Sequence, residues 1–242
     1  MDTQFTDNEY SFIYCDGIEN NYWNKARNKT ILKKIKRLPV KNILDIGCGR
    51  GVVTDHLFKN GVCVTGIELG ITTPISNSKV PIQYNSDALS IPAEKSITYD
   101  TLTLFDVLEH IEDPVQFLTN LNAHFKNVEY LVLTVPARQE LWTNFDEYNR
   151  HFKRYDLETL KKEIEKSGFK IEENFYFFHL LYVVIKLNNA LFKKRAIQFK
   201  APTGIVKMIH ACIAGLLYFS DRIIPNKIVG SSVMCVAKKI KK

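Results

Sequence analysis

Several classes of protein are excluded by what this sequence lacks. Its five cysteines are an odd number and never form a Cys-x-x-Cys pair. This argues against a disulfide framework or a thiolate zinc site and favours reduced thiols in the cytoplasm. The first residues carry neither the basic flank nor the apolar run of a secretory signal. Internal repeats and low-complexity tracts are missing too, so we expect a globular chain.

Acidic residues are almost missing from the last part of the chain. Residues 174–242 hold 12 Lys and Arg and one acid, Asp221, which gives a net charge of +11. The rest holds 21 basic residues (33 − 12) and 25 acidic ones (26 − 1), a net charge of −4. A basic, apolar region can contact a membrane surface, an anionic substrate or nucleic acid. A solvated basic face over ordinary core helices would leave the same pattern.

The order of the apolar segments predicts a single α/β domain with an elaboration. The 242 residues are 45% hydrophobic, which is enough to bury a core. We expect helices at 22–38, 52–60, 115–124 and 157–167, and strands at 42–46, 62–68, 82–84, 99–105, 130–135, 169–177 and 232–237. Because nearly continuous apolar strands alternate with helices, they predict a doubly wound parallel sheet.

Four segments divide the chain. Residues 1–21 contain aromatic side chains but no clear period, and we expect a mobile N-terminal arm. Residues 22–177 form the core, 178–227 a basic and apolar helical insertion, and 228–242 the last strand with a basic tail. Polar residues, Lys186, Asn188 and Asn189, interrupt the first apolar stretch of the insertion, and the second is shorter than the roughly 18–20 apolar residues of a membrane span. The insertion is therefore interpreted either as a cap over the active site or as a helix pair at a membrane surface.

A glycine-rich loop follows the first predicted strand and precedes a helix. Gly47, Gly49 and Gly51 have the spacing Gly-x-Gly-x-Gly rather than the Gly-x-Gly-x-x-Gly of dinucleotide sites. Asp45, just before the loop, would repel a diphosphate but suits the cationic amino group of an amino-acid-like ligand. Glu68 ends the next strand, where a carboxylate accepts hydrogen bonds from ribose hydroxyls.

These segments resemble the motifs of class I S-adenosylmethionine-dependent methyltransferases. Residues 43–51 look like the family's motif I, 86–92 resemble the loop whose Asp meets the adenine amino group, and 99–114 are similar to its fourth-strand block. The resemblance implies S-adenosylmethionine as cofactor and S-adenosylhomocysteine as product. It also implies a Rossmann-like seven-stranded sheet whose last strand, at 232–237, is antiparallel and lies between the fifth and sixth.

Residues 22–27 are similar to the aromatic–Arg helix that these enzymes place over the cofactor, where Arg27 would pair with the methionine carboxylate. A surface Arg beside two packed aromatics is the other interpretation. By the resemblance, the cofactor-binding residues are Arg27, Asp45, Gly47, Cys48, Gly49, Gly51, Glu68, Leu69, Asp87, Ala88, Phe105 and Asp106.

Glu109 and His110 follow the fourth strand on the side where an acceptor should bind. In ubiquinone-pathway O-methyltransferases, which this block resembles, an acid, a Glu and a His bind a divalent metal. The matching positions here are Asp106, Glu109 and His110, but the first holds Asp where that family has Glu, so we expect no metal. His110 is interpreted as a general base or as a structural residue at the start of the next helix.

Residues 142–155 concentrate acidic, aromatic and basic side chains in the loop after the fifth strand. They resemble the Asp…His-x-x-Arg-Tyr segment of bacterial methyltransferases from surface-polysaccharide and lipid-linked pathways. The resemblance implies that Asp146 and His151 contact or deprotonate a hydroxyl and that Arg154 holds an anionic group or the loop. An ordinary polar loop with Arg154 bridged to Asp146 or Glu147 is the alternative.

We therefore expect a methyltransferase that acts on the hydroxyl of a small molecule, with a sugar or lipid-linked saccharide as the first choice. A prenylated or other lipid phenol is the alternative, and peripheral membrane contact through residues 178–227 would suit it. A nucleic-acid substrate is disfavoured because residues 105–108 lack the Asn/Asp-Pro-Pro-aromatic motif of base methyltransferases. A non-catalytic binding protein that kept the fold is the alternative from another class.

Overall fold

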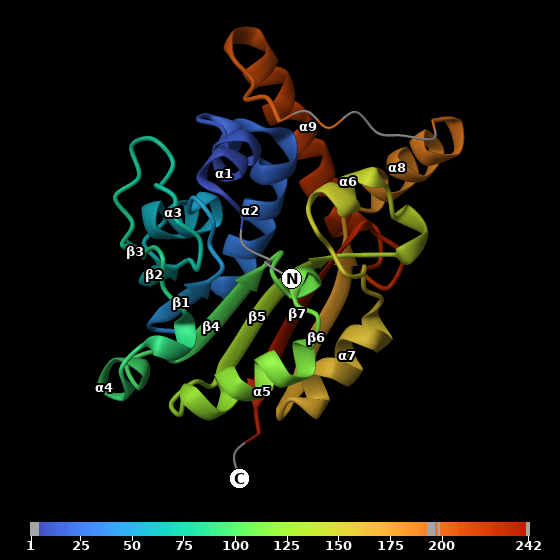
Figure 1. Ribbon diagram of the computed structural model, residues 1–242. Coiled ribbons are helices and arrows are strands. Elements are labelled where there is room, and N and C mark those ends of the chain that lie inside the picture. Colours follow the sequence, from blue (N-terminus) through green and yellow to red (C-terminus); the bar gives the residue numbers. More distant parts are fainter. Residues whose placement is uncertain (1–4, 193–196, 198, 241–242) are drawn as a thin grey trace.

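Seven strands form one mixed sheet in the order β3-β2-β1-β4-β5-β7-β6 (Figure 1). The computed structural model describes residues 5–192, 197 and 199–240. The strands are β1 Ile43–Ile46, β2 Val64–Ile67, β3 Ile82–Gln83, β4 Thr101–Phe105, β5 Tyr130–Pro136, β6 Phe169–Phe177 and β7 Ser232–Lys239. Strand β7 pairs antiparallel with both β5 and β6. The predicted seven-stranded sheet with an antiparallel last strand is confirmed.

Helices connect and cover these strands. The α-helices are α1 Asp7–Ile13, α2 Tyr22–Ile35, α3 Val52–Lys59, α4 Ala93–Ser96, α5 Pro114–His124, α6 Asn144–Tyr148, α7 Leu157–Lys166, α8 His179–Leu191 and α9 Gly204–Ile223. The short 3-10 helices are η1 Ile18–Asn20, η2 Ala88–Ser90, η3 Leu108–His110 and η4 Gln139–Leu141. The helix expected over 22–38 is therefore three residues shorter, and the last strand runs two residues further than expected, to Lys239.

The two faces of the sheet are covered by different helices (Figure 1). Leu118 of α5 and Leu160 of α7 belong to the hydrophobic cluster on one face. Ile31 of α2, Leu57 of α3 and Leu217 of α9 belong to the cluster on the other. Each such side chain contributes about 1.5–3 kcal/mol by leaving water. Helices on both faces of a sheet with buried central strands make the fold doubly wound, as predicted.

Helix boundaries follow local signals in the sequence. Asp156 caps the N-terminus of α7 and forms a capping box with Thr159. Gly168 follows the end of that helix with a φ of 84°, the left-handed conformation that commonly stops a helix. The expected cap and stop of this helix are both confirmed. Asp113 caps α5 by accepting a hydrogen bond from the N–H of Gln116, and Pro114 takes the first position of that helix.

The N-terminal arm, where the structure describes it, is not irregular as expected. Thr6 and Glu9 form a capping box that starts α1, and Tyr10 and Ile13 are buried. The expectation that residues 5–21 have no regular structure is wrong because two polar residues at the right spacing start a helix and an aromatic residue anchors it. The mobility of the arm stays a prediction. Residues 1–4 of the arm lie outside the described residues.

The insertion forms the two helices α8 and α9, which extend from one end of the sheet (Figure 1). Helix α9 has 20 residues and, among the described parts of the chain, is the helix long and apolar enough to cross a membrane by length and composition. The expectation that this stretch is too short is therefore wrong, because Ala, Cys and Gly extend the apolar run. Residues 193–196 and 198 of the insertion, and 241–242 of the basic tail, are outside the described residues.

Candidate active site

The glycine loop occupies the carboxyl end of β1, between that strand and α3. Gly51 has a φ of 81°, and a Cβ atom placed there would come within 2.5 Å of Ile82 Cδ1. Gly47, with a φ of 70°, would bring a Cβ within 2.7 Å of a Val107 methyl. Side chains other than hydrogen would strain the backbone and clash, so the loop is held tight against the sheet. The backbone is thereby free to approach a ligand closely.

Asp45, just before the loop, is buried at 1% exposure. Its two carboxylate oxygens accept hydrogen bonds from the hydroxyls of Thr54, at 2.6 Å, and Thr103, at 2.8 Å. Burial raises the pKa of Asp45 to about 6, and the two hydroxyls oppose that shift. A carboxylate kept at this cost beside a ligand loop suits a cationic partner, and its contact with such a partner stays a prediction.

Glu68 ends β2 and turns its carboxylate toward the loop. One oxygen accepts from the backbone N–H of Gly49 at 2.7 Å. The other accepts from the N–H of Gly70 and from the hydroxyl of Tyr10, both at 2.9 Å. This arrangement fixes the carboxylate directly over the loop.

Tyr10 and Tyr14, both from the N-terminal region, stand over the loop, and the sequence reasoning missed them. Their rings are stacked with centroids 6.4 Å apart, and Tyr14 lies against Gly49. Burial and the Glu68 carboxylate raise the pKa of Tyr10 strongly, so its hydroxyl is a donor at physiological pH. The four-residue spacing of the two tyrosines behind a capping box was the available signal.

The remaining predicted cofactor residues lie around the same edge of the sheet. Asp87 follows β3 and caps η2 by accepting a hydrogen bond from the N–H of Leu89 at 2.9 Å. Ala88 is buried beside it, Phe105 ends β4 at 7% exposure, and Leu69 is 44% exposed after β2. The carboxyl ends of β1, β2 and β4 are thus brought together, as the topology of a parallel sheet requires.

Arg27 reaches the site from α2. Its guanidinium group forms an ion pair with Asp106 and lies 4.3 Å from the centre of the Trp23 ring. Thr134 donates a second hydrogen bond to Asp106 at 3.1 Å. Within the described residues, the buried Nε of Arg27 has no hydrogen-bond partner. A carboxylate ligand would satisfy this donor, which fits the predicted contact with the methionine part of the cofactor.

Glu109, His110 and His151 form a cluster on the acceptor side of the site. Their nearest ligand atoms all lie within 4.8 Å of one another, and the two imidazole rings meet edge to face at 4.7 Å. Burial, and then the neighbouring His151, lower the pKa of His110 to about 3, so it is neutral at physiological pH. Burial and then Asp106 raise the pKa of Glu109. Of the described residues, these three are the group that has the donor atoms to hold a metal ion.

The loop after β5 places Asp146, His151 and Arg154 together, and it contains the Arg154–Asp146 bridge expected by the structural alternative. Asp146 Oδ1 lies 3.0 Å from His151 Nδ1, and Arg154 donates to both carboxylate oxygens at 2.8 Å and 3.0 Å. Burial opposes ionisation, but the hydrogen bonds from His151 and Arg154 lower the pKa of Asp146 to about 2. An ionised carboxylate only accepts, so Nδ1 of His151 carries the hydrogen, and in the neutral form of the imidazole Nε2 has a free lone pair.

Nε2 of His151 points toward Glu109, with 4.0 Å between that nitrogen and Glu109 Oε1. Asp146 also accepts from the N–H of Thr143 at 2.9 Å and so starts α6. A loop that binds the acceptor and a loop that is only held by its own polar contacts are therefore not exclusive interpretations. One buried carboxylate both folds the loop and orients the imidazole, a carboxylate–histidine arrangement used in general-base catalysis.

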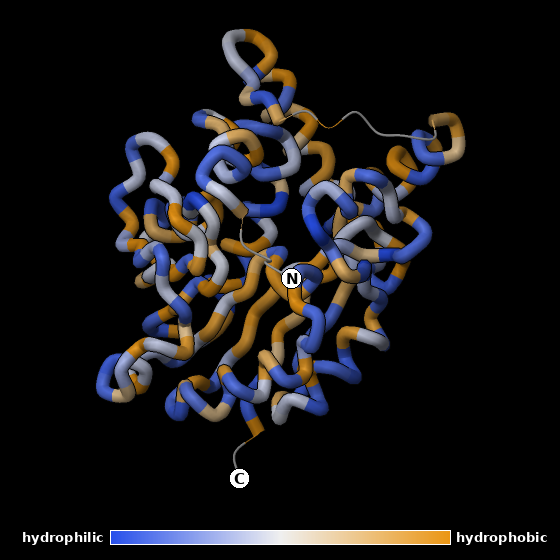
Figure 2. Tube along the Cα trace, in the orientation of Figure 1, coloured by the Kyte–Doolittle hydropathy of each residue, from blue (hydrophilic) through white to orange (hydrophobic). Residues whose placement is uncertain are grey.

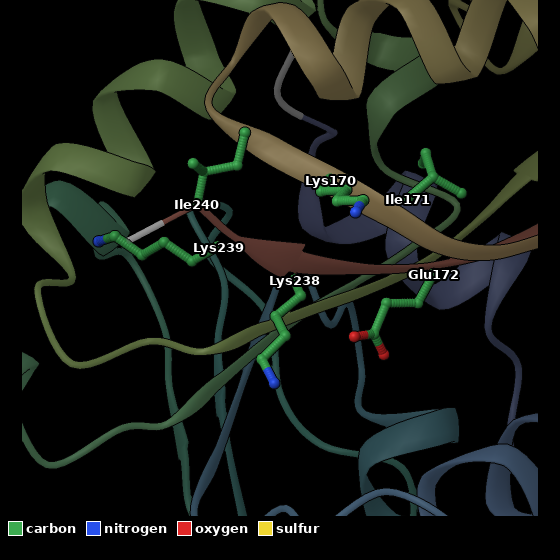
Figure 3. A pocket seen from close by; sticks show the side chains of 6 residues that line it. All are labelled: Lys170, Ile171, Glu172, Lys238, Lys239 and Ile240. Carbon is green, nitrogen blue, oxygen red and sulfur yellow. The ribbon is translucent and has the colours of Figure 1, made fainter. Parts of the chain in front are cut away.

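A depression lies at the other end of the sheet and has no part in this site. Its volume is about 520 Å³, and Figure 3 shows the side chains that line it on β6, on β7 and just after β7, namely Lys170, Ile171, Glu172, Lys238, Lys239 and Ile240. These residues begin β6 and end β7, opposite the carboxyl ends of β1 and β4. Ligands of open α/β sheets bind at the carboxyl ends of the strands.

Sheet order, glycine loop and strand-end carboxylates together define the fold class of methyltransferases. The chain matches a family model described as a methyltransferase domain over residues 22–174, and it belongs to that family. It is 30% identical over 111 residues to a ubiquinone biosynthesis O-methyltransferase of Vibrio parahaemolyticus, a match covering 43% of this chain and 47% of that protein. A ubiquinone biosynthesis O-methyltransferase of Coxiella burnetii is 28% identical over 138 residues, or 54% and 53% of the two chains.

The chain thus spans about half the length of the curated relatives it matches. Among solved structures, phosphoethanolamine N-methyltransferase 2 of Haemonchus contortus in complex with S-adenosyl-L-methionine has the same fold, with a TM-score of 0.57 and 18% identity. That match covers 99% of this chain and 59% of the other. The family and the loop geometry agree on S-adenosylmethionine as the cofactor.

Proposed function

We propose that this protein transfers the methyl group of S-adenosylmethionine to a hydroxyl group of a small molecule, with His151 as the general base. The observation that carries the proposal is the buried Asp146–His151 pair beside the cofactor edge of the sheet. The pair leaves Nε2 of His151 as an acceptor for the proton of a bound hydroxyl. Arg154 holds Asp146 in its ionised form and so keeps this tautomer in place.

The cofactor supplies a methyl group on a sulfonium, a leaving group that needs no further activation. What the protein contributes is the alignment of the acceptor and the removal of its proton. The hydroxyl oxygen forms the new bond to the methyl carbon, the carbon–sulfur bond breaks with its electron pair going to sulfur, and the proton goes to His151 Nε2. S-adenosylhomocysteine is the second product.

A saccharide or lipid-linked saccharide is the first candidate for the acceptor. The support comes from the segment 142–155, which resembles that of bacterial methyltransferases from such pathways and which places Asp146, His151 and Arg154 together. A lipid phenol is the second candidate. It is favoured by the curated relatives, both called ubiquinone biosynthesis O-methyltransferase, and by the apolar insertion next to the acceptor loop.

Replacing the proposed base tests this function. We expect His151→Gln to lower methyl transfer by about 100-fold or more, because general-base catalysis contributes on that order, while S-adenosylhomocysteine still binds in calorimetry. His56→Gln, a histidine on α3, is the matched control and should keep full activity. The assay uses S-adenosylmethionine with two acceptor panels, lipid-linked saccharides and prenylated phenols. Full activity of His151→Gln would contradict the proposed base.

The role of a metal is tested separately. With His151 oriented by Asp146, the proton transfer needs no metal, so dialysis against a chelator should leave activity unchanged. Loss of activity that Mg²⁺ or Mn²⁺ restores would instead make Glu109, His110 and His151 a metal site. If calorimetry detects binding of neither S-adenosylmethionine nor S-adenosylhomocysteine, the protein is not a methyltransferase and the proposal fails as a whole.

A further inference from the structure

The two helices of the insertion expose a large share of the apolar surface of this protein. Among the described residues, 14 of the 22 large apolar side chains that are exposed lie between residues 183 and 228. Figure 2 shows hydrophobic segments along both helices, out to the end where α9 extends beyond the rest of the molecule. Soluble monomers rarely leave contiguous apolar surface of this kind uncovered. The concentration therefore marks a surface that another molecule covers.

This surface, called here the apolar surface of the insertion, has two parts. On α8 and just after it, the exposed residues are Val183, Val184, Leu187, Leu191 and Phe192. On α9 and just after it, they are Ile205, Val206, Met208, Ile209, Ile213, Leu216, Phe219, Ile223 and Ile228. The first half of α9 is exposed nearly all round. An intramolecular lid position would bury at least one face of it, so this half is not packed as a cap over the site.

Basic side chains accompany the apolar ones. Residues 178–227 contain eight Lys and Arg and one acid, Asp221. The first half of α9, residues 204–213, is called here its outer half. Lys200, just before it, and Lys207, within it, are exposed. The acid is occupied within the fold, because its carboxylate accepts hydrogen bonds from the N–H groups of Phe178 and His179 and so caps α8. The surface is thus apolar and cationic, with its one acid turned to a structural role.

The inner half of α9 is part of the folded core. Ala214 and Leu217 are buried at 0% and 3% exposure in the cluster that α2 also joins, and His210 accepts a hydrogen bond from the N–H of Tyr22 at 3.2 Å. A helix fixed in this way cannot leave the protein to cross a bilayer. Its length therefore does not make it a membrane span, and the exposed half is left to lie at a surface.

The apolar surface of the insertion adjoins the acceptor side of the active site. Tyr182 of α8 donates to Glu140 at 3.1 Å, next to the start of the loop that carries Asp146 and His151. Phe199, between α8 and α9, packs against Phe145 of that loop with ring centroids 5.7 Å apart. A molecule held at this surface would be close to the proposed base.

We propose that the apolar surface of the insertion docks the protein on the anionic face of a lipid bilayer, with the outer half of α9 inserted among the headgroups. Exposed apolar side chains flanked by Lys and Arg are the combination that an anionic lipid surface binds. A second copy of the chain fits less well. An isologous dimer would bring two copies of the same cationic surface, each with Lys200 and Lys207 exposed, against each other.

Vesicle sedimentation tests the proposal with the full chain, in the absence of donor and acceptor. We expect the protein to sediment with phosphatidylglycerol-containing vesicles at least about tenfold more than with pure phosphatidylcholine vesicles, and to be released by salt. The double variant Ile205→Asp/Met208→Asp should lose this binding. Its matched control is Phe58→Asp/Ile97→Asp, which places two charges at exposed apolar positions elsewhere and should bind like the original protein.

Charge reversal tests the electrostatic part in the same assay. Lys200→Glu/Lys207→Glu should bind phosphatidylglycerol vesicles about tenfold less, while Lys95→Glu/Lys126→Glu, at two exposed lysines elsewhere, should bind normally. The binding of S-adenosylhomocysteine checks that each variant is folded. Sedimentation with neither kind of vesicle, or equally with both, would overturn the proposal.

Light scattering addresses the alternative occupant. A stable dimer that Ile205→Asp/Met208→Asp dissociates would also overturn membrane docking, because it would show that a second copy covers this surface. The inference does not depend on the proposed acceptor. A failure to bind vesicles would contradict membrane docking and leave the proposed base unaffected. Full activity of His151→Gln would contradict the proposed base and leave membrane docking unaffected.

Discussion

The hydroxyl of Tyr10 donates a hydrogen bond to Glu68 at 2.9 Å, across 58 residues of sequence. Helix α1 therefore lies over the glycine loop and uses one acceptor of the very carboxylate that is expected to hold the ribose. The ring of Tyr10 also lies against Gly70. A bound ribose and the Tyr10 hydroxyl would compete for the same oxygen of Glu68.

This competition predicts the effect of removing the hydroxyl alone. Tyr10→Phe should tighten the binding of S-adenosylhomocysteine about three- to tenfold. In the unchanged protein the ribose must first displace the Tyr10 hydroxyl from Glu68, and a hydrogen bond to a charged group is worth about 1 kcal/mol or more. Isothermal calorimetry measures the change. Tyr14→Phe keeps the second ring over Gly49 and should change affinity less than about twofold. Weaker binding by Tyr10→Phe would mean that the hydroxyl belongs to the bound complex.

Asp146→Asn is expected to reduce turnover while leaving the cofactor affinity unchanged. The amide can no longer fix the tautomer of His151, and loss of an orienting carboxylate typically costs about 10²–10⁴ in kcat. The KM for S-adenosylmethionine should stay within about twofold, since Asp146 is on the acceptor side. Asp156→Asn, at the N-cap of α7, is the matched control. Equal loss of turnover in both variants would indicate general destabilisation instead.

The same carboxylate gives the fold a pH dependence with a definite sign. The folded pKa of Asp146, about 2, is below the ordinary value of 3.8. Its contribution to stability is therefore complete above about pH 4 and is lost as the pH falls toward 2. Urea unfolding between pH 5 and 2.5 should show a smaller drop in the free energy of unfolding for Asp146→Asn than for the unchanged protein. If the free energy of unfolding falls with pH equally in the variant and the unchanged protein, His151 and Arg154 do not stabilise the ionised carboxylate of Asp146.

Asp45 should show the opposite sign. Its folded pKa of about 6 is above the ordinary 3.8, so its stabilising contribution is present below about pH 4 and is lost as the pH rises through 6. At pH 7.5, Asp45→Asn should raise the free energy of unfolding by about 1–3 kcal/mol and weaken S-adenosylmethionine binding. At pH 4 the variant and the original protein should be equally stable. A variant that is less stable at pH 7.5 would contradict this account.

Two glycines with nearly the same backbone conformation allow the cost of backbone strain to be distinguished from the cost of a steric clash. Gly51 and Gly61 have φ angles of 81° and 79°, but a Cβ at Gly61 would meet nothing within 4 Å. Gly61→Ala should cost about 1–2 kcal/mol of stability, the price of a left-handed backbone. Gly51→Ala should cost about 0.5–1.5 kcal/mol more, because its Cβ meets Cδ1 of Ile82 and that side chain must leave its rotamer, and it should also weaken cofactor binding. Denaturant unfolding measures the loss of stability, and calorimetry measures the loss of cofactor affinity. An equal loss of stability in the two variants would contradict a steric contribution at Gly51.

Much of the fold could be predicted because its signals are local. The apolar runs of the strands, the capping Asp156 and the stop at Gly168 lie within a few residues of the elements they define. The glycine loop and Asp45 are likewise contiguous with β1, so their meeting at one strand end follows from the chain itself. The sequence also sufficed for the antiparallel last strand, once the resemblance of the earlier motifs was recognised.

What only the tertiary structure decided depends on contacts between distant segments. The partner of Arg27 is Asp106, 79 residues away, and the cover over Glu68 is a tyrosine from an N-terminal segment that shows no clear periodicity. The exposure of the outer half of α9 could not be predicted either, because the sequence pattern of an apolar helix is the same whether a protein core or a membrane covers it. Local sequence determined which elements form and where the cofactor loop lies. Packing between elements decided which polar groups face each other and which apolar face is left open.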